Sequence, residues 1–261
     1  MFGKLLKYEI KSIGKWYLGL LFITSLVAIA TGNSVKRFIT TIETSSYNYV
    51  GYQVGSYLRD NVMFLFLLAA LFGLLIAVTI ASYVIIIRRF YASLFSRQGY
   101  LTMTLPVSTH SILLSKLLVS TLLFITTYLL FAIIILAFVL PHVEWSEVVK
   151  VFSEVMSKVP PSESTFWFIV WNLDAFLSTI LAVLWIYLAI SIGQLFNTYR
   201  VLMGFVSYGI IWLILTLISF LLAFTFTDGS LILVDLVMTI VGLIASYIAT
   251  HAIIKHKLNL E

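Results

Sequence analysis

The sequence predicts an all-α membrane protein with six transmembrane helices, and two observations support that fold class. Hydrophobic residues make up 61% of the 261 residues and charged residues only 10%, with a mean hydropathy of +1.08. The apolar residues gather in runs of about 20 residues or more, which as helices match a bilayer core of about 30 Å. A soluble domain has no need of so much apolar surface, so residues 1–261 are expected to form a single polytopic membrane domain.

The polar connections between the apolar runs are too short to form a soluble domain, since each has fewer than about 35 residues. The chain has no cysteine, so it has neither disulfides nor thiolate ligands. Its four histidines show no paired-ligand spacing, and no Walker A, Rossmann or serine-hydrolase motif occurs. We therefore expect no metal site and no catalytic residues. The net charge of +5 comes from residues beside the apolar runs, so it does not indicate nucleic-acid binding.

The N-terminal segment 1–15 is predicted to be an amphipathic helix at the membrane surface. Its lysines recur every three or four residues and share one face: Lys4, Lys7, Lys11 and Lys15. Apolar residues fill the remainder, so the lysines would face lipid headgroups. The first span is expected at 16–32. Although Ala28-Ile29-Ala30 resembles a signal-peptide cleavage site, the long amphipathic segment before it favours a retained span.

The second span, expected at 62–87, carries a seam of small residues at four-residue spacing: Ala69, Gly73, Ala77 and Ala81. Small side chains on one stripe let helix backbones approach closely in lipid. We therefore expect a helix contact along this seam, either within the chain or between two chains. The polar residues 33–61 before this span contain no catalytic pattern.

The segment 88–116 is a long polar interruption with four basic residues and no acid, and it reads RRFYASLFSRQGYLTMTLPVSTHSILLSK. Its first part is predicted to be a short helix. One face of that helix is apolar and aromatic, formed by Phe90, Tyr91, Leu94 and Phe95. Gly99 is expected to end the helix in a left-handed conformation. Pro106 then blocks continuation, and a new helix starts near Ser108.

Two interpretations of this segment stay open. A basic loop fixes the orientation of the spans beside it, because positive loops stay in the cytoplasm. The aromatic face favours a further role as a docking surface for a cytoplasmic partner. The residues expected to form that surface are Arg88, Arg89, Phe90, Tyr91, Leu94, Phe95, Arg97, Gln98 and Gly99.

The third span is expected at 117–140, and the last three at 166–196, 201–226 and 231–254. The fourth is longer than a bilayer needs, so it tilts, protrudes or breaks. Between the third and fourth spans, residues 141–165 repeat apolar residues at intervals of three and four with charged residues on the other side. This pattern predicts an amphipathic helix outside the cell, either packed on the membrane surface or acting as a lid over an exit.

Basic residues are distributed unevenly between the two sides of the membrane. With the N-terminus inside, eleven of the 16 fall on the inner face: Lys4, Lys7, Lys11, Lys15, Arg88, Arg89, Arg97, Lys116, Arg200, Lys255 and Lys257. The outer face holds Lys36, Arg37, Arg59, Lys150 and Lys158. Because cytoplasmic loops carry the excess of Lys and Arg, both termini and the segment 88–116 are predicted to be cytoplasmic.

Two acids lie inside the apolar segments, Asp174 and Asp235. A charge at mid-bilayer costs about 2.5–3.5 kcal/mol on insertion scales, so such residues usually face a partner or water. Both lie toward the outer ends of their spans, with Trp171 and Asn172 close to Asp174. They indicate either outer-leaflet residues that are hydrated or paired with a cation, or a polar patch at the outer mouth of a transport pathway.

The segment 88–116 resembles the cytoplasmic loop between the second and third spans of type 2 ABC-transporter permeases from bacterial exporters. The matching residues are Gly99-Tyr100-Leu101-Thr102, Thr104-Leu105-Pro106 and Ser115-Lys116. The N-terminal amphipathic helix and the total of six spans are also similar to that family. One feature departs from it: the outer amphipathic helix here follows the third span, whereas many relatives place outer helices between the last two.

The resemblance implies the permease half of an ATP-driven exporter in the cell membrane, with no enzymatic activity of its own. Two permease chains, identical or related, would pair with two separate ABC ATP-binding subunits, which would bind ATP and Mg²⁺. The segment 88–116 would form the coupling helix that docks into a groove of the ATPase. Membrane lipid would be the remaining partner.

The implied substrate is hydrophobic or amphipathic, and similarity to small peptide exporters points to a membrane-active peptide. Lipid or drug export is the alternative within the same architecture. An ion-coupled carrier or channel, and a membrane sensor or scaffold, remain from other classes. A co-purifying nucleotide-binding subunit would favour the exporter, whereas proton-dependent flux by the isolated chain would favour the carrier.

Overall fold

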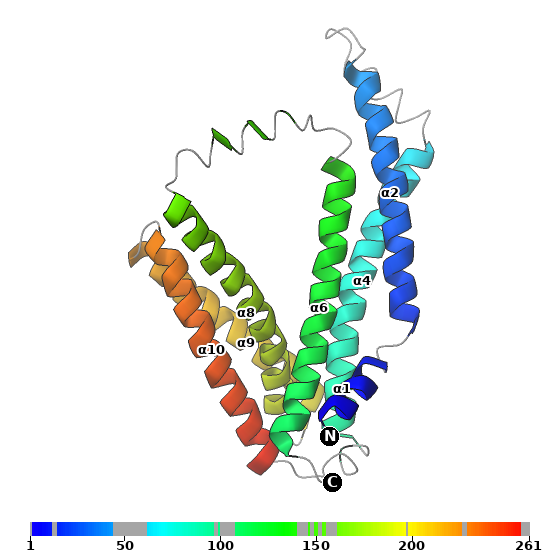
Figure 1. Cartoon of the computed structure of the whole chain (residues 1–261). Helices are drawn as coiled ribbons and strands as arrows, with labels where there is room; N and C mark the ends of the chain where they lie inside the picture. The colour runs from blue at the N-terminus through cyan, green and yellow to red at the C-terminus, as the bar shows by residue number, and fades with distance from the viewer. Residues whose placement is uncertain are drawn as a thin grey trace. The chain divides into compact units, whose positions relative to one another are not determined.

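The computed structural model describes residues 2–11, 15–43, 62–96, 99, 108–139, 146, 149–150, 153–154, 161–196, 198–225 and 229–256. Long helices make up nearly all of this part of the chain (Figure 1). They are α1 (Phe2–Lys11), α2 (Lys15–Glu43), α4 (Val62–Leu94), α6 (Thr109–Val139), α8 (Pro161–Gly193), α9 (Arg200–Thr225) and α10 (Gly229–His256). Within it, every helix except α1 is long and apolar enough to cross a membrane, which gives six candidate spans. The predicted all-α membrane fold is confirmed.

The apolar segments are helical because lipid offers no hydrogen-bond partners to the backbone. A helix satisfies each N–H and C=O within its own segment, which is why helices are a stable way to span a bilayer. Hydroxyl side chains inside the spans obey the same requirement by bonding to the preceding turn. Thr24 Oγ1 donates to the Leu20 carbonyl at 2.7 Å, and Thr79 Oγ1 donates to the Leu75 carbonyl at 2.8 Å.

Several helices run past the ends expected from hydropathy. The helix α2 continues beyond residue 32 to Glu43, and α4 continues beyond residue 87 to Leu94. The helix α6 starts at Thr109 rather than at residue 117. Polar residues end a hydrophobic run but do not end a helix, because helix propensity does not follow apolarity. The predicted separate helix after Arg88 is therefore wrong, and its first residues form the last turns of α4.

The helices pack as two units. The helices α4 and α6 are divided between them, with one part of each helix in unit 1 and the other part in unit 2. Unit 1 comprises Met1–Ser12, Val84–Phe124 and Val159–Glu261. Unit 2 comprises Ile13–Tyr83 and Ile125–Lys158.

In unit 2, three buried hydroxyl groups join α2, α4 and α6, and we call them the hydroxyl cluster. Tyr17 Oη lies 2.9 Å from Ser82 Oγ and 2.8 Å from Thr127 Oγ1, and the last two oxygens are 3.0 Å apart. Side-chain hydrogen bonds of this kind contribute about 0.6 kcal/mol on average between transmembrane helices. The cluster therefore fixes which faces of the three helices meet more than it adds stability.

In unit 1, α8 packs against both α9 and α10. The turn between α8 and α9 is tight, with Tyr199 in a left-handed conformation at φ 60°. A Cβ atom added to Gly193 would lie only 2.6 Å from the Arg200 carbonyl oxygen and 2.7 Å from the Gly204 nitrogen. Glycine at position 193 is thus required for the backbones of α8 and α9 to come this close.

Some sequence predictions concern residues outside the described part of the chain. Most of the expected outer amphipathic helix at 141–165 lies there, as do Arg97, Gln98 and the GYLT–TLP stretch except Gly99. The same is true of the side chain of Lys4.

Candidate functional site

Three charged side chains from three helices of unit 1 meet at one point, and we call them the charge junction. Glu9 of α1 accepts a hydrogen bond through Oε1 from Lys116 Nζ of α6 at 2.7 Å. Through Oε2 and its backbone carbonyl, Glu9 also accepts hydrogen bonds from Arg89 Nη2 of α4. The side chains of Glu9, Arg89 and Lys116 are only 20%, 18% and 6% exposed. A single carboxylate therefore ties α1 to two membrane helices.

The amphipathic pattern of α1 brings Glu9 to this position. Lys7, Tyr8 and Lys11 are exposed, whereas Leu6 and Glu9, which are three residues apart, are partly buried on a shared face. Sequence analysis singled out the lysines of this helix and missed Glu9. A signal was present, since Glu9 is the only acid among the first 42 residues and lies in helical register with the apolar residues rather than with the lysines.

Phe90, which follows Arg89 in α4, forms an aromatic stack with Tyr187 of α8. The rings of Phe90 and Tyr187 are 3.8 Å apart between centroids and nearly parallel, at 7°. Both side chains are fully buried. The Tyr187 hydroxyl is also 2.8 Å from Ser120 Oγ of α6. The charge junction and this stack together connect the last turns of α4 to α1, α6 and α8.

The aromatic contacts continue from the buried stack toward the surface of unit 1. Phe90 meets Phe95 edge to face at 6.0 Å, and Phe95 meets Tyr91 at 6.3 Å. Tyr91 is 36% exposed and Phe95 is half-buried. A continuous series of rings therefore leads from Tyr187, in the core, to Tyr91 at the surface.

The structure contradicts the predicted exposure of two residues of the docking surface, Phe90 and Leu94. Phe90 and Leu94 are buried inside the chain rather than exposed on an apolar face. The physical reason is that α4 continues unbroken to Leu94, so these side chains keep the register of the span and turn into unit 1. Arg89 is engaged in the charge junction, while Arg88 and Tyr91 are exposed.

Gly99 is needed for a different reason from the one predicted. Its backbone is outside the left-handed region, and its N–H donates to the Ser96 carbonyl at 2.7 Å. A Cβ atom at this position would overlap the Leu94 carbonyl oxygen. The close approach of the chain to the end of α4, rather than an unusual φ, excludes a side chain here.

Two histidines far apart in the sequence meet where α6 begins and α10 ends. The rings of His110 and His251 stack with centroids 3.8 Å apart. His110 Nδ1 lies 3.0 Å from the Tyr247 hydroxyl, and His251 Nε2 lies 3.0 Å from Thr109 Oγ1. Among the described residues, no group of three or more His, Cys, Asp or Glu could hold a metal ion. These contacts join the start of α6 to the end of α10.

The four residues expected along a transport pathway separate into two groups. Asp174 of α8 and Asp235 of α10 are close enough for the charge of one to act on the other. The amide nitrogen of Asn172 instead donates to the Phe168 carbonyl of its own helix at 2.8 Å, and Trp171 is exposed. The structure thus brings the two acids together and leaves Trp171 and Asn172 apart from any polar group on another helix that it describes.

The small-residue seam of α4 is mostly open. Ala69 and Gly73 are exposed, Ala77 is half-buried, and Ala81 is buried. A Cβ atom added to Gly73 would meet nothing within 4 Å. Among the surface lysines, Lys7, Lys11 and Lys15 are exposed as expected. In the described part of the chain, the seam therefore leaves room at Gly73 for another helix.

Comparison of the chain with protein-family models, with curated proteins and with solved structures finds no match in any of the three.

Proposed function

We propose that this chain is the transmembrane subunit of an ATP-driven exporter, and that the last turns of α4 receive the movement of a separate ATP-binding subunit. One observation carries this proposal. Residues 88–95 present Arg88 and Tyr91 at the surface while holding Arg89 and Phe90 inside, against α1 and α8. Arginine and tyrosine are residue types that dominate interface hot spots.

This arrangement suits the transmission of force. A partner that displaced Tyr91 would push on Phe95 and Phe90, and Phe90 rests flat against Tyr187 of α8. Close-packed side chains have little room to yield, so a displacement at the surface is passed on rather than absorbed. The same movement would reach α1 and α6 through Arg89 and Glu9.

The resemblance of the segment 88–116 to permease loops supports an ATPase as the partner. The chain carries no nucleotide-binding motif, so a separate subunit would supply the energy. In this proposal the end of α4 at Leu94 faces the cytoplasm, in agreement with the excess of basic residues predicted on that side. The open seam at Gly73 would meet a second permease chain, and the exported substrate would be hydrophobic or amphipathic.

Site-specific photo-crosslinking tests the proposal. A benzophenone amino acid replaces Tyr91 in the tagged full-length chain, which is expressed in its native cells and irradiated in intact membranes. The matched control carries the same group at Ile80, an exposed position on the same helix. We expect position 91 alone to be crosslinked to a protein that contains a Walker A sequence, identified by mass spectrometry, and the purified complex to hydrolyse ATP.

Other results would contradict this function. Crosslinking to the same protein from both positions would mean that residue 91 is not at a specific interface. Proton-dependent flux by the purified chain alone in vesicles would assign it to the ion-coupled carriers instead.

A further inference from the structure

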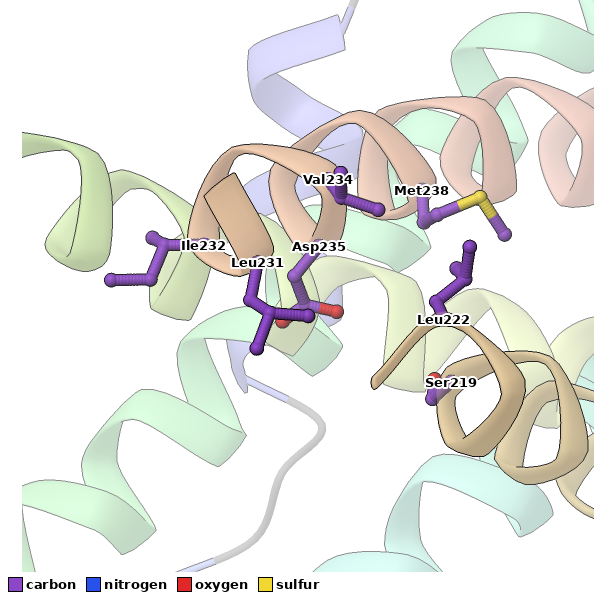
Figure 2. A pocket seen from close by; sticks show the side chains of 7 residues that line it. All are labelled: Ser219, Leu222, Leu231, Ile232, Val234, Asp235 and Met238. Atoms are coloured by element: carbon purple, nitrogen blue, oxygen red, sulfur yellow. The ribbon is translucent and has the colours of Figure 1, made fainter. Parts of the chain in front are cut away.

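A cavity of about 230 Å³ lies between the end of α9 and the start of α10, both in unit 1 (Figure 2). Its walls are largely apolar, with Leu222 from α9 and Leu231 and Met238 from α10. Two side chains add polar atoms, the hydroxyl of Ser219 and the carboxylate of Asp235. Figure 2 shows the Asp235 carboxylate among apolar side chains. The combination of apolar walls and one charged group is typical of a small-molecule site.

Asp235 is exposed at this cavity, and none of the described residues balances its charge. Asp235 lies within the apolar span Leu231–Lys255, and the negative charge of Asp174 acts on it from α8. Asp174 Oδ1 is buried without a hydrogen-bond partner in the described structure. No described lysine, arginine or histidine forms an ion pair with either acid. An ionised acid inside a span is rarely left without a partner or water, so this wall of the cavity is complementary to a cation.

The size of the cavity limits what the cation can be. Its volume is about 230 Å³, and it is partly open to the outside of the chain. Most sites for whole drug-sized ligands are larger, at about 300–1,000 Å³. The cavity therefore fits one short alkyl chain with a compact charged head, while the remainder of a larger ligand would stay outside. A primary ammonium is such a head group, and it can donate three hydrogen bonds.

We propose that this cavity binds a primary alkylammonium group. The ammonium would donate to the Asp235 carboxylate and the alkyl chain would pack against Leu222, Leu231 and Met238. A free alkylamine and a lysine side chain of an amphipathic peptide share this chemistry. If the chain is an exporter, the site defines its substrate class as cationic and amphipathic. That last step rests on the proposed function, whereas binding to the cavity does not.

Direct binding tests the proposal without reference to transport. The full-length chain is placed in nanodiscs of phosphatidylcholine, a lipid without a primary ammonium, and binding of radiolabelled hexylammonium is measured by scintillation proximity. We expect saturable binding that Asp235→Asn weakens at least tenfold, or about 1.4 kcal/mol, because the charge-assisted hydrogen bond is lost. Met238→Trp, which fills the cavity at unchanged charge, should weaken binding by a similar factor. Glu154→Gln removes an exposed acid that does not line the cavity and should leave binding unchanged.

Three results would overturn the proposal in variants that elute like the wild type on size exclusion. They are full binding by Asp235→Asn, full binding by Met238→Trp, and equal competition by hexanol, which has the same chain length but no charge. Two peptides distinguish the sources of the ligand. Displacement by a lysine-containing amphipathic peptide, but not by its norleucine counterpart, assigns the group to a peptide. If unlabelled hexylammonium displaces the label and neither peptide does, the bound ammonium group is assigned to a free amine. Either assignment supports the proposed chemistry.

Discussion

Glu9 holds two cations with one carboxylate, and this makes its loss more damaging than the loss of an ordinary surface charge. In Glu9→Gln, the Lys116 ammonium would stay 6% exposed with no anion beside it. Removing one partner of a buried ion pair costs about 3–5 kcal/mol, because the other charge is left uncompensated. We expect Glu9→Gln to lower the melting temperature of the purified chain clearly, with a cost toward the lower end of that range, since Glu9 itself is partly exposed.

A double substitution separates this cause from a general effect on α1. Glu9→Gln combined with Lys116→Met removes the carboxylate together with the more buried cation, so much of the lost stability should return. Lys7→Gln, on the exposed side of α1, should leave the melting temperature unchanged. If the two junction substitutions were simply additive, the ion pair would not be responsible.

At the residue scale, the sequence predicted which residues share a helix face, but it did not predict which side chains contact one another between helices. The exposure of the lysines of α1 was predictable, because charged residues that recur every three or four positions form one polar face of a helix, and such a face is exposed in most surroundings. The pairing of Glu9 with Arg89 and Lys116 was not predictable, because it joins residues about 80 and 107 positions apart and depends on how α1 meets α4 and α6. The same holds for His110 and His251, which the sequence shows only as isolated histidines.

At the scale of helices, the contact between α8 and α9 depends on Gly193. In Gly193→Ala, the new methyl group would overlap backbone atoms of Arg200 and Gly204, which cannot turn away as a flexible side chain could. Overpacking of this kind costs about 1–3 kcal/mol. We expect Gly193→Ala to lower the thermal stability of the purified chain in detergent.

Gly209 of α9 provides the matched control. A methyl group there would meet nothing within 4 Å. Because alanine favours a helix by up to about 1 kcal/mol over glycine, Gly209→Ala should be neutral or stabilising. Equal destabilisation by both substitutions would mean that loss of glycine, rather than the close helix contact, is the cause.

Hydropathy located the spans because a helix needs about 20 consecutive apolar residues to cross the bilayer core. It could not locate the helix ends. The last turns of α4 contain Arg88, Arg89 and Ser93, which lower hydropathy while remaining compatible with a helix. The expected break after residue 87 followed from reading the end of the apolar run as the end of the helix. For the same reason, Phe90 and Leu94 were assigned to an exposed face, although the continuous helix turns them inward.

At the scale of the whole molecule, the fold class followed from composition, whereas orientation rests on the uneven distribution of Lys and Arg. Because the chain has no cysteine, single cysteines report orientation cleanly. With both termini in the cytoplasm, Ser153→Cys should react with a membrane-impermeant maleimide in intact cells, whereas Thr198→Cys should react only after permeabilisation. Both positions are exposed, so lack of reaction cannot be attributed to burial within the chain. The reverse pattern of labelling would invert the topology and remove the proposed cytoplasmic contact at Tyr91.

The hydroxyl cluster of unit 2 has fewer hydrogens than contacts. Tyr17, Ser82 and Thr127 supply three O–H hydrogens, yet they make three contacts with one another, and Ser82 Oγ also lies 2.8 Å from the Val78 carbonyl as a donor. At any instant at least one of these four contacts lacks a hydrogen of its own, and the hydrogens can redistribute by rotation of the hydroxyls while the helices stay in place. Each helix contributes one hydroxyl, so the loss of any one of the three would remove its helix from the cluster and leave a single contact between the other two.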